Sequence, residues 1–116
     1  MSAGSRPNRL HERVRLRTWV KLMAEGKPHL LGHIEDISPA GLGLRHATAL
    51  PCGQACEVYF GLPWQGRERL IEASARITAC QPAEAEGQYH IELAFLSFQD
   101  SAAADLIADF IRQHGL

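Results

Sequence analysis

The sequence lacks any apolar run long enough to cross a bilayer, for which a helix needs about 20 consecutive apolar residues. Its opening residues, MSAGSRPNRLHER, also lack the apolar stretch of a secretory signal peptide. From these two absences we expect a cytoplasmic protein that does not insert into a membrane. The hydrophobic content of 46% and the length of 116 residues are ordinary for a globular domain with its own core.

Cysteine is scarce, since the chain has only Cys52, Cys56 and Cys80. An odd set of three does not suggest a disulfide framework. Cys52 and Cys56 could form half of a zinc site, but no second Cys or His pair with the spacing of a zinc finger accompanies them. The six histidines are scattered, at positions 11, 29, 33, 46, 90 and 114. We therefore predict free thiols and no metal site.

The motifs of the common catalytic classes are also missing from the chain. It contains no GxSxG, HExxH or GxxxxGK[ST] motif, and no GxGxxG follows a predicted strand. No recognisable set of nucleophile, base and oxyanion donor is present. The sequence therefore predicts a protein that is not an enzyme, with no catalytic residues and no cofactor.

Basic residues are crowded into the start of the chain. The first 21 residues hold six basic side chains and one acidic side chain, whereas the remaining residues hold six basic and twelve acidic ones. A charge asymmetry of this kind suggests that the front of the chain meets something anionic. A solvated basic tail with no ligand explains the same composition equally well.

The central part of the chain alternates apolar and polar residues with a period of two, which is typical of β-strands. The clearest segment is LIEASARITAC, in which positions 71, 73, 75, 77 and 79 form the apolar side. Polar or Pro/Gly-rich turns separate the segments. We predict strands near residues 18–24, 30–37, 42–46, 55–62, 70–80 and 89–98.

The end of the chain changes to helical spacing. Asp100 or Ser101 can cap a helix, and Gly115 can end it. Its apolar stripe, which we expect to cover an open end or face of the sheet, consists of Ala103, Leu106, Ile107, Phe110 and Ile111. Six strands and one helix predict a mainly β domain, either a small antiparallel barrel or a sandwich. We expect residues 1–8 to form a flexible arm and residues 9–116 a single domain.

Two short motifs flank the first predicted hairpin. RLHER supplies Arg9 and Arg13 before the first strand, and DISPAG supplies Asp36, Ser38 and Gly41 at the end of the second. A hairpin returns its second strand to the place where the first began, so the motifs can lie side by side. Arginine can bind O6 and N7 of guanine, or a phosphate, with two parallel hydrogen bonds. A carboxylate can accept from the N–H donors on the opposite guanine edge, and a glycine allows close approach of a ligand.

Together these motifs resemble the PilZ domain family, the bacterial receptor module for cyclic di-GMP, whose pattern is RxxxR followed by [D/N]xSxxG. The resemblance runs from Arg9 to the final helix and includes the segments GLGL and LPCGQACEVYFGLP. It implies a six-stranded antiparallel β barrel with a C-terminal α-helix. It also implies that Arg9 and Arg13 bind phosphates and guanine edges from a mobile arm, that Asp36 and Ser38 bind a guanine, and that Gly41 keeps the loop compatible with the ligand.

Three positions depart from the family's pattern. Asn8 stands where many relatives have another arginine, and Ala79 falls where some have an aromatic side chain that stacks on a base. Glu92 falls where many have glycine, and its charge would oppose a dianionic ligand if it pointed toward the pocket. These departures bear on affinity and on whether one or two ligand molecules bind.

Three functions follow in order of preference. The first is a non-enzymatic receptor that binds cyclic di-GMP and relays the signal to a protein partner of unknown identity. The second is a protein–protein adaptor on the same barrel with little or no nucleotide binding. The third, a binder of nucleic acid or acidic membrane through the basic arm, is disfavoured by the acidic remainder of the chain.

Overall fold

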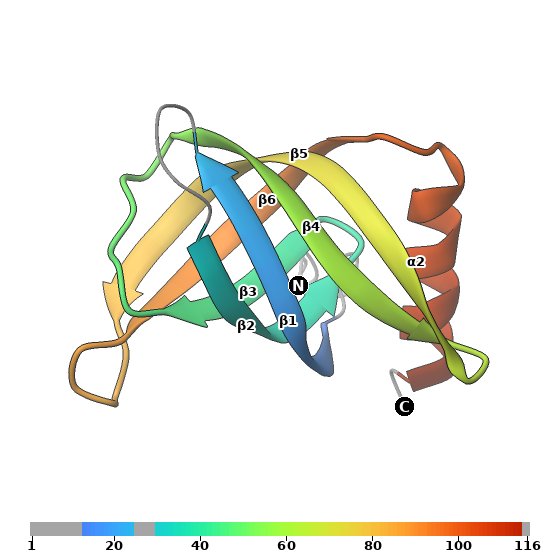
Figure 1. The fold of residues 1–116 in the computed structure, drawn as a ribbon, viewed down its shortest axis with the longest axis horizontal. Helices are drawn as coiled ribbons and strands as arrows, with labels where there is room; N and C mark the ends of the chain where they lie inside the picture. The colour runs from blue at the N-terminus through green and yellow to red at the C-terminus, as the bar shows by residue number, and fades with distance from the viewer. Residues whose placement is uncertain (1–12, 25–29, 115–116) are drawn as a thin grey trace, which may run out of the picture.

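Figure 1 shows the fold of the computed structural model, which describes residues 13–24 and 30–114. These residues form six strands and a helix: β1 (Val14–Ala24), β2 (Leu30–Ser38), β3 (Gly41–His46), β4 (Ala55–Trp64), β5 (Arg67–Pro82), β6 (Tyr89–Phe98) and α2 (Ala102–His114). The fold class predicted from the family resemblance, a six-stranded antiparallel β barrel with a C-terminal helix, is confirmed.

The strands close into a barrel in the order β1-β2-β3-β6-β5-β4, and every neighbouring pair is antiparallel. The barrel closes where β1 pairs with β4, from Val20 opposite Phe60 to Ala24 opposite Cys56. Closure gives each of the six strands two hydrogen-bonded neighbours, which removes the exposed edges of an open sheet. It also places β3 between β2 and β6, and this order builds the site described below.

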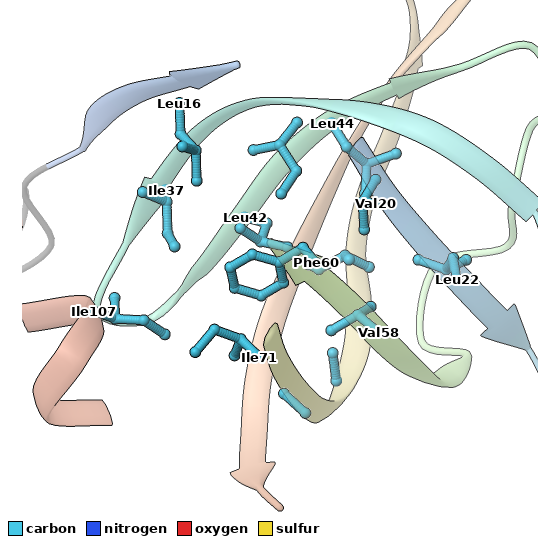
Figure 2. Close-up of a cluster of buried hydrophobic side chains, with 14 of the residues drawn as sticks. Leu16, Val20, Leu22, Ile37, Leu42, Leu44, Val58, Phe60, Ile71 and Ile107 are labelled. Atoms are coloured by element: carbon cyan, nitrogen blue, oxygen red, sulfur yellow. The ribbon is translucent and has the colours of Figure 1, made fainter. Parts of the chain in front are cut away.

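Apolar side chains from all six strands fill the interior of the barrel. Phe60 is the largest fully buried side chain, and Figure 2 shows it among Leu42, Val58 and Ile71. Burying a side chain of this size contributes about 1.5–3 kcal/mol to folding. Val58 and Phe60 on one face of β4 have no exposed surface, so the predicted alternation holds from Ala55 to Phe60; it ends at Gly61, which is also buried.

The helix lies at one end of the barrel (Figure 1). Its buried side chains, which join the barrel core, are Ala103, Ile107, Phe110 and Ile111. Asp100 Oδ1 accepts a hydrogen bond of 2.9 Å from the backbone N–H of Ala102, so the predicted cap is present. The helix ends at His114, and the predicted stop at Gly115 lies outside the described residues. Within the described part of the chain, no helix is both long and apolar enough to cross a membrane.

The first strand begins at Val14, earlier than the change of pattern at Thr18 predicts. Val14 pairs with Ile37 of β2, and both Val14 and Leu16 are buried. The alternation of buried and exposed residues therefore continues back through the basic segment. Arg15 and Arg17 are exposed and alternate with Val14 and Leu16, as expected for residues on one face of a strand.

A β-bulge on β2 turns two consecutive carboxylates toward the outside of the barrel. Ile34 pairs with Leu44 and Asp36 pairs with Gly43, so Glu35 is an extra residue on β2 relative to β3. Ile34 is buried, whereas Glu35 and Asp36 are both partly exposed. A bulge of this kind redirects side chains at the point where it is inserted.

A second bulge, on β5, interrupts the alternation that we predicted for residues 71–79. Between Ile77 and Ala79 the strand advances by two residues while β6 advances by one, so Thr78 is the extra residue. The prediction that Ala79 continues the apolar side of this strand was wrong, because alternation holds only as far as Ile77. Beyond the bulge it is Cys80 that packs against the core.

Candidate functional site

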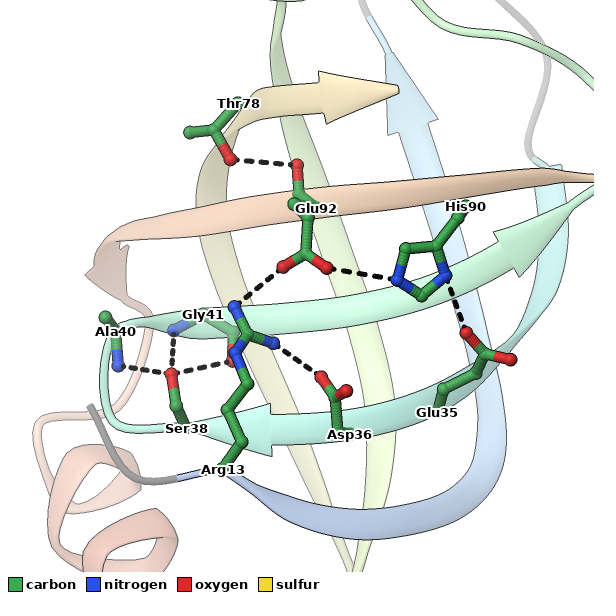
Figure 3. A network of polar contacts seen from close by, with 9 residues as sticks. All are labelled: Arg13, Glu35, Asp36, Ser38, Ala40, Gly41, Thr78, His90 and Glu92. Carbon is green, nitrogen blue, oxygen red and sulfur yellow. Dashed lines mark hydrogen bonds and ion pairs between the residues drawn. The ribbon is translucent and has the colours of Figure 1, made fainter. Parts of the chain in front are cut away.

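Arg13, one residue before β1, lies at the centre of the candidate site (Figure 3). Its Nη1 donates a hydrogen bond of 2.5 Å to Asp36 Oδ1, and its Nη2 donates one of 2.7 Å to Glu92 Oε1. Its side chain is 41% exposed. One guanidinium group therefore joins a carboxylate from β2 to a carboxylate from β6, across the intervening strand β3.

The pairing register explains why these groups meet. Arg15, Asp36, Gly43, Glu92 and Ala79 form one continuous row of paired residues across β1, β2, β3, β6 and β5. Residues that are paired across neighbouring strands project on the same side of the sheet. Asp36 and Glu92 therefore face outward on either side of the same residue of β3.

Gly43 leaves space for the two carboxylates to approach Arg13. A Cβ atom at this position would lie 2.6 Å from Asp36 Oδ1 and 3.2 Å from Glu92 Oε2. Both distances are shorter than ordinary van der Waals contact. The absence of a side chain in the middle of the row is thus a condition for the contacts between Arg13 and its two acidic partners.

A chain of polar contacts extends from Glu92 toward the neighbouring row. His90 Nε2 lies 3.2 Å from Glu92 Oε2, and His90 Nδ1 lies 2.7 Å from Glu35 Oε1. Arg45 Nη2 contacts the other oxygen of Glu35 at 2.7 Å. Figure 3 shows His90 between the carboxylates of Glu35 and Glu92. Glu35 can take part because the bulge on β2 turns it outward.

Ser38 is fully buried at the end of β2, and its hydroxyl group holds the turn into β3. The Oγ atom accepts hydrogen bonds from the backbone N–H groups of Ala40, at 3.1 Å, and Gly41, at 3.2 Å. It also donates to the carbonyl of Gly41 at 3.5 Å. Short polar side chains commonly stabilise turns in this way. The structure therefore places Ser38 beside Asp36, with its hydroxyl engaged by the backbone.

Gly41 is required by the packing of β3 against β6. A Cβ atom at this position would lie 1.8 Å from the carbonyl oxygen of Leu93 and 3.1 Å from the Cα atom of Ala94. Its φ angle is not among the positive values of the described residues, which belong to residues 53, 65, 66 and 87. Gly41 thus permits the close approach of a backbone, and that backbone belongs to β6.

Two hollows flank Arg13 on the outside of the barrel. The smaller, of about 550 Å³, extends over Ser38, Gly41, Thr78 and Leu93. The larger, of about 1010 Å³, extends in the other direction and is lined by residues that include Arg15, Arg17, Trp19, His33, Asp36 and Arg45. Arg13 lines both hollows and stands between them. A ligand that contacts Arg13 can therefore occupy either side.

The site offers two kinds of polar recognition. The Arg13 guanidinium can form charge-assisted hydrogen bonds to phosphate oxygens, and Asp36 can accept from N–H donors. Arg15 and Arg17 add positive charge along the larger hollow. Within residues 13–24 and 30–114, no cluster of three or more His, Cys, Asp or Glu side chains is placed to hold a metal ion.

The structure describes all but one of the residues predicted from the two motifs, and it gives them different surroundings. Arg13 and Asp36 are in direct contact, and Ser38 and Gly41 form the adjoining turn. Arg9 lies outside the described residues. Glu92 points toward the site, which was the condition under which it would oppose an anionic ligand.

Sequence analysis did not identify Gly43, Glu35, Arg45 or His90 as parts of the site. The alternation in YHIELAF could have indicated His90, because it places that residue on the same outward face as Glu92. Glu35 carries no such signal, because its orientation depends on a bulge defined by pairing with β3.

Comparison with protein families matches residues 7–113 to the PilZ domain. Among solved structures, the Bacillus subtilis inhibitor of motility MotI/DgrA is similar, with 17% identity and a TM-score of 0.75, over 89% of this chain and 49% of that one. The PilZ domain of YcgR from Escherichia coli, solved with c-di-GMP, has 12% identity and a TM-score of 0.60, over 90% and 88% of the two chains.

MrkH from K. pneumonia, in its complex with c-di-GMP, has 19% identity and a TM-score of 0.64, over 89% of this chain and 49% of that one. The chain therefore spans about half the length of MotI and of MrkH. No match was found among curated proteins. At these identities the structural likeness shows the fold alone, whereas the family match covers most of the chain. This chain belongs to the PilZ domain family.

Proposed function

We propose that this chain is a cytoplasmic, non-enzymatic receptor for cyclic di-GMP that relays ligand binding to a protein partner. The observation that carries the proposal is the contact between Arg13 and Asp36 beside the turn formed by Ser38 and Gly41. These residues follow the order of the RxxxR and [D/N]xSxxG motifs of the PilZ family. The complexes of YcgR and MrkH with c-di-GMP support the same ligand for this chain.

Each motif residue has a physical role in this proposal. Arg9 and Arg13 bind the phosphates and the O6 and N7 edge of guanine, where the two-pronged guanidinium fits best. Asp36 accepts from the N–H donors on the opposite edge of the base. Ser38 and Gly41 fix the turn that presents Asp36, Ser38 through its bonds to the backbone and Gly41 through close packing on β6.

The test is isothermal titration of the purified full chain with cyclic di-GMP at near-physiological salt, with GTP as the control ligand. We expect saturable binding at micromolar concentration or below, and no binding of GTP. Arg13→Ala and Asp36→Ala should each weaken binding by about 2 kcal/mol or more, roughly a thirtyfold rise in Kd. Arg67→Ala is the matched control, because Arg67 is exposed in the β4–β5 hairpin and lines neither hollow. Unchanged affinity in both site variants would overturn the assignment.

One observation favours the adaptor as a second candidate. The Arg13 guanidinium already contacts two carboxylates, and these contacts compete with a ligand phosphate for its positive charge and its N–H donors. A flat titration of folded protein would support the adaptor. So would a protein partner that is retained equally well with and without the dinucleotide.

A further inference from the structure

We propose that Glu92 is an affinity-determining residue that competes with the phosphate of cyclic di-GMP for Arg13, and that His90 holds Glu92 once the ligand has displaced it. This inference rests on the proposed function, because it assigns a role toward the same ligand. To the residues supplied by the two motifs it adds Glu92, which competes with the ligand for Arg13, and His90, which is the alternative partner of Glu92.

Glu92 occupies the atoms that a phosphate would use. It accepts from Nη2 of Arg13 at 2.7 Å, while Asp36 accepts from Nη1. Each terminal nitrogen thus gives one N–H donor to a carboxylate, and a phosphate that binds across these two nitrogens must displace one of the carboxylates. The ligand carries negative charge, so any carboxylate that stays near Arg13 also repels it.

Of the two carboxylates, Glu92 is the better placed to leave. Its second oxygen, Oε2, already lies 3.2 Å from His90 Nε2. Asp36 has no ion-pair partner other than Arg13 among the described residues. If Glu92 leaves Arg13, it keeps its contact with His90. If Asp36 leaves Arg13, it keeps no ion-pair partner among the described residues. Asp36 is also the group that the proposed function assigns to the guanine N–H donors, so it remains useful in the complex.

The surroundings of His90 support its role as the holder of Glu92. His90 is fixed from the other side by Glu35, whose Oε1 lies 2.7 Å from Nδ1, and Arg45 in turn fixes Glu35. The imidazole ring is thus oriented with Nε2 toward Glu92, as Figure 3 shows. Gly43 completes the arrangement, because a larger residue would block the path of the Glu92 side chain across β3.

The first experiment compares the affinity of the wild type and Glu92→Gln for cyclic di-GMP by isothermal titration. The Glu92–Arg13 pair is partly exposed, so we expect binding to tighten by at least about threefold when the competing charge is removed. Glu57→Gln is the matched control, because it removes the same charge from β4, which lies opposite β3 in the barrel. The control should bind within about twofold of the wild type.

The second experiment tests His90 with a double-mutant cycle. His90→Ala alone should weaken binding, because displaced Glu92 then loses its alternative partner and returns to Arg13. In the Glu92→Gln background the same substitution should have little effect, and this non-additivity would not arise from a purely structural role of His90. Thermal unfolding of all four proteins establishes that they are folded.

The outcomes separate the two proposals. If the wild type binds and Glu92→Gln binds no more tightly, the competition is refuted and the receptor stands. If Glu92→Gln binds and the wild type does not, the competition is supported in its strongest form. If neither folded protein binds, the receptor proposal fails and this inference fails with it. Equal, additive effects of His90→Ala in both backgrounds would refute the role of His90.

Discussion

The motif glycine Gly41 provides a test of whether part of the family signature serves the fold. In Gly41→Ala the new Cβ atom would lie 1.8 Å from the carbonyl oxygen of Leu93, where ordinary contact begins at 3.4 Å. The obstructing atoms are backbone, so no side chain can rotate away to make room. Strand β3 must therefore move away from β6 by about 1.5 Å or more.

The cost can be worked out from the contacts in this region. Overpacking of a tight site costs about 1–3 kcal/mol, and each backbone hydrogen bond lost costs about 0.5–1.5 kcal/mol. The bond most at risk is the one from the Phe95 N–H to the Ala40 carbonyl, at 2.7 Å. We expect Gly41→Ala to lower the free energy of unfolding by about 3 kcal/mol. Urea denaturation followed by circular dichroism measures this change.

Gly43→Ala is the control for the same strand. Its Cβ atom would meet the carboxylate of Asp36, whose position is adjustable, rather than the backbone of a neighbouring strand. We therefore expect a loss of stability below about 1 kcal/mol, together with weaker cyclic di-GMP binding because Asp36 moves away from Arg13. If Gly41→Ala unfolds at the same urea concentration as the wild type and only loses ligand affinity, the packing argument for Gly41 is refuted.

Two further predictions concern the helix cap and the buried thiol. Asp100→Ala should lower the free energy of unfolding by about 1 kcal/mol by removing the acceptor for Ala102 N–H, whereas Asp100→Asn should restore most of it in urea denaturation. Burial, with a smaller contribution from Glu57, raises the pKa of Cys56 from 9.0 to about 11. The unfolded thiol loses its proton first, so this contribution to stability is present below pH 9 and is lost as the pH rises toward 11. As the pH rises from 9 to 11, the urea concentration at the midpoint of unfolding should fall more steeply for the wild type than for Cys56→Ala. If the midpoints of the two proteins fall in parallel, this prediction is contradicted.

The fold was predictable wherever the alternation of residues was uninterrupted. Strand β6 occupies residues 89–98 as predicted, because Ile91 and Leu93 alternate with polar neighbours along its first half. The start of β1 was missed, because the arginines at 13, 15 and 17, which alternate with Val14 and Leu16, resemble a solvated tail until pairing with β2 is known. The error at Ala79 has a related cause, since a bulge is defined by a partner strand distant in sequence.

The site was predictable to the extent that its residues lie in two local motifs. The spacing of Arg13 and Asp36 around one hairpin was sufficient to predict that their motifs can lie side by side, because a hairpin brings together residues at its open end; their direct contact was not predicted. The contributions of Glu35, Arg45 and His90 depend on the order β2-β3-β6 and on the bulge at Glu35. Neither feature can be read from the period of a single strand.

The receptor and adaptor hypotheses differ in which groups pair with the positive charge of Arg13. Arg13 faces the carboxylates of Asp36 and Glu92, and in the receptor hypothesis a ligand phosphate replaces Glu92. Both acidic residues lie in one row of paired strands on either side of Gly43, so we expect this exchange to leave the barrel unchanged. In that hypothesis the exchange acts on the chain at Arg13, which immediately precedes β1 and follows the segment that carries Arg9. A signal from this site is therefore expected to leave through the start of β1, and a partner protein that senses the ligand should contact that region.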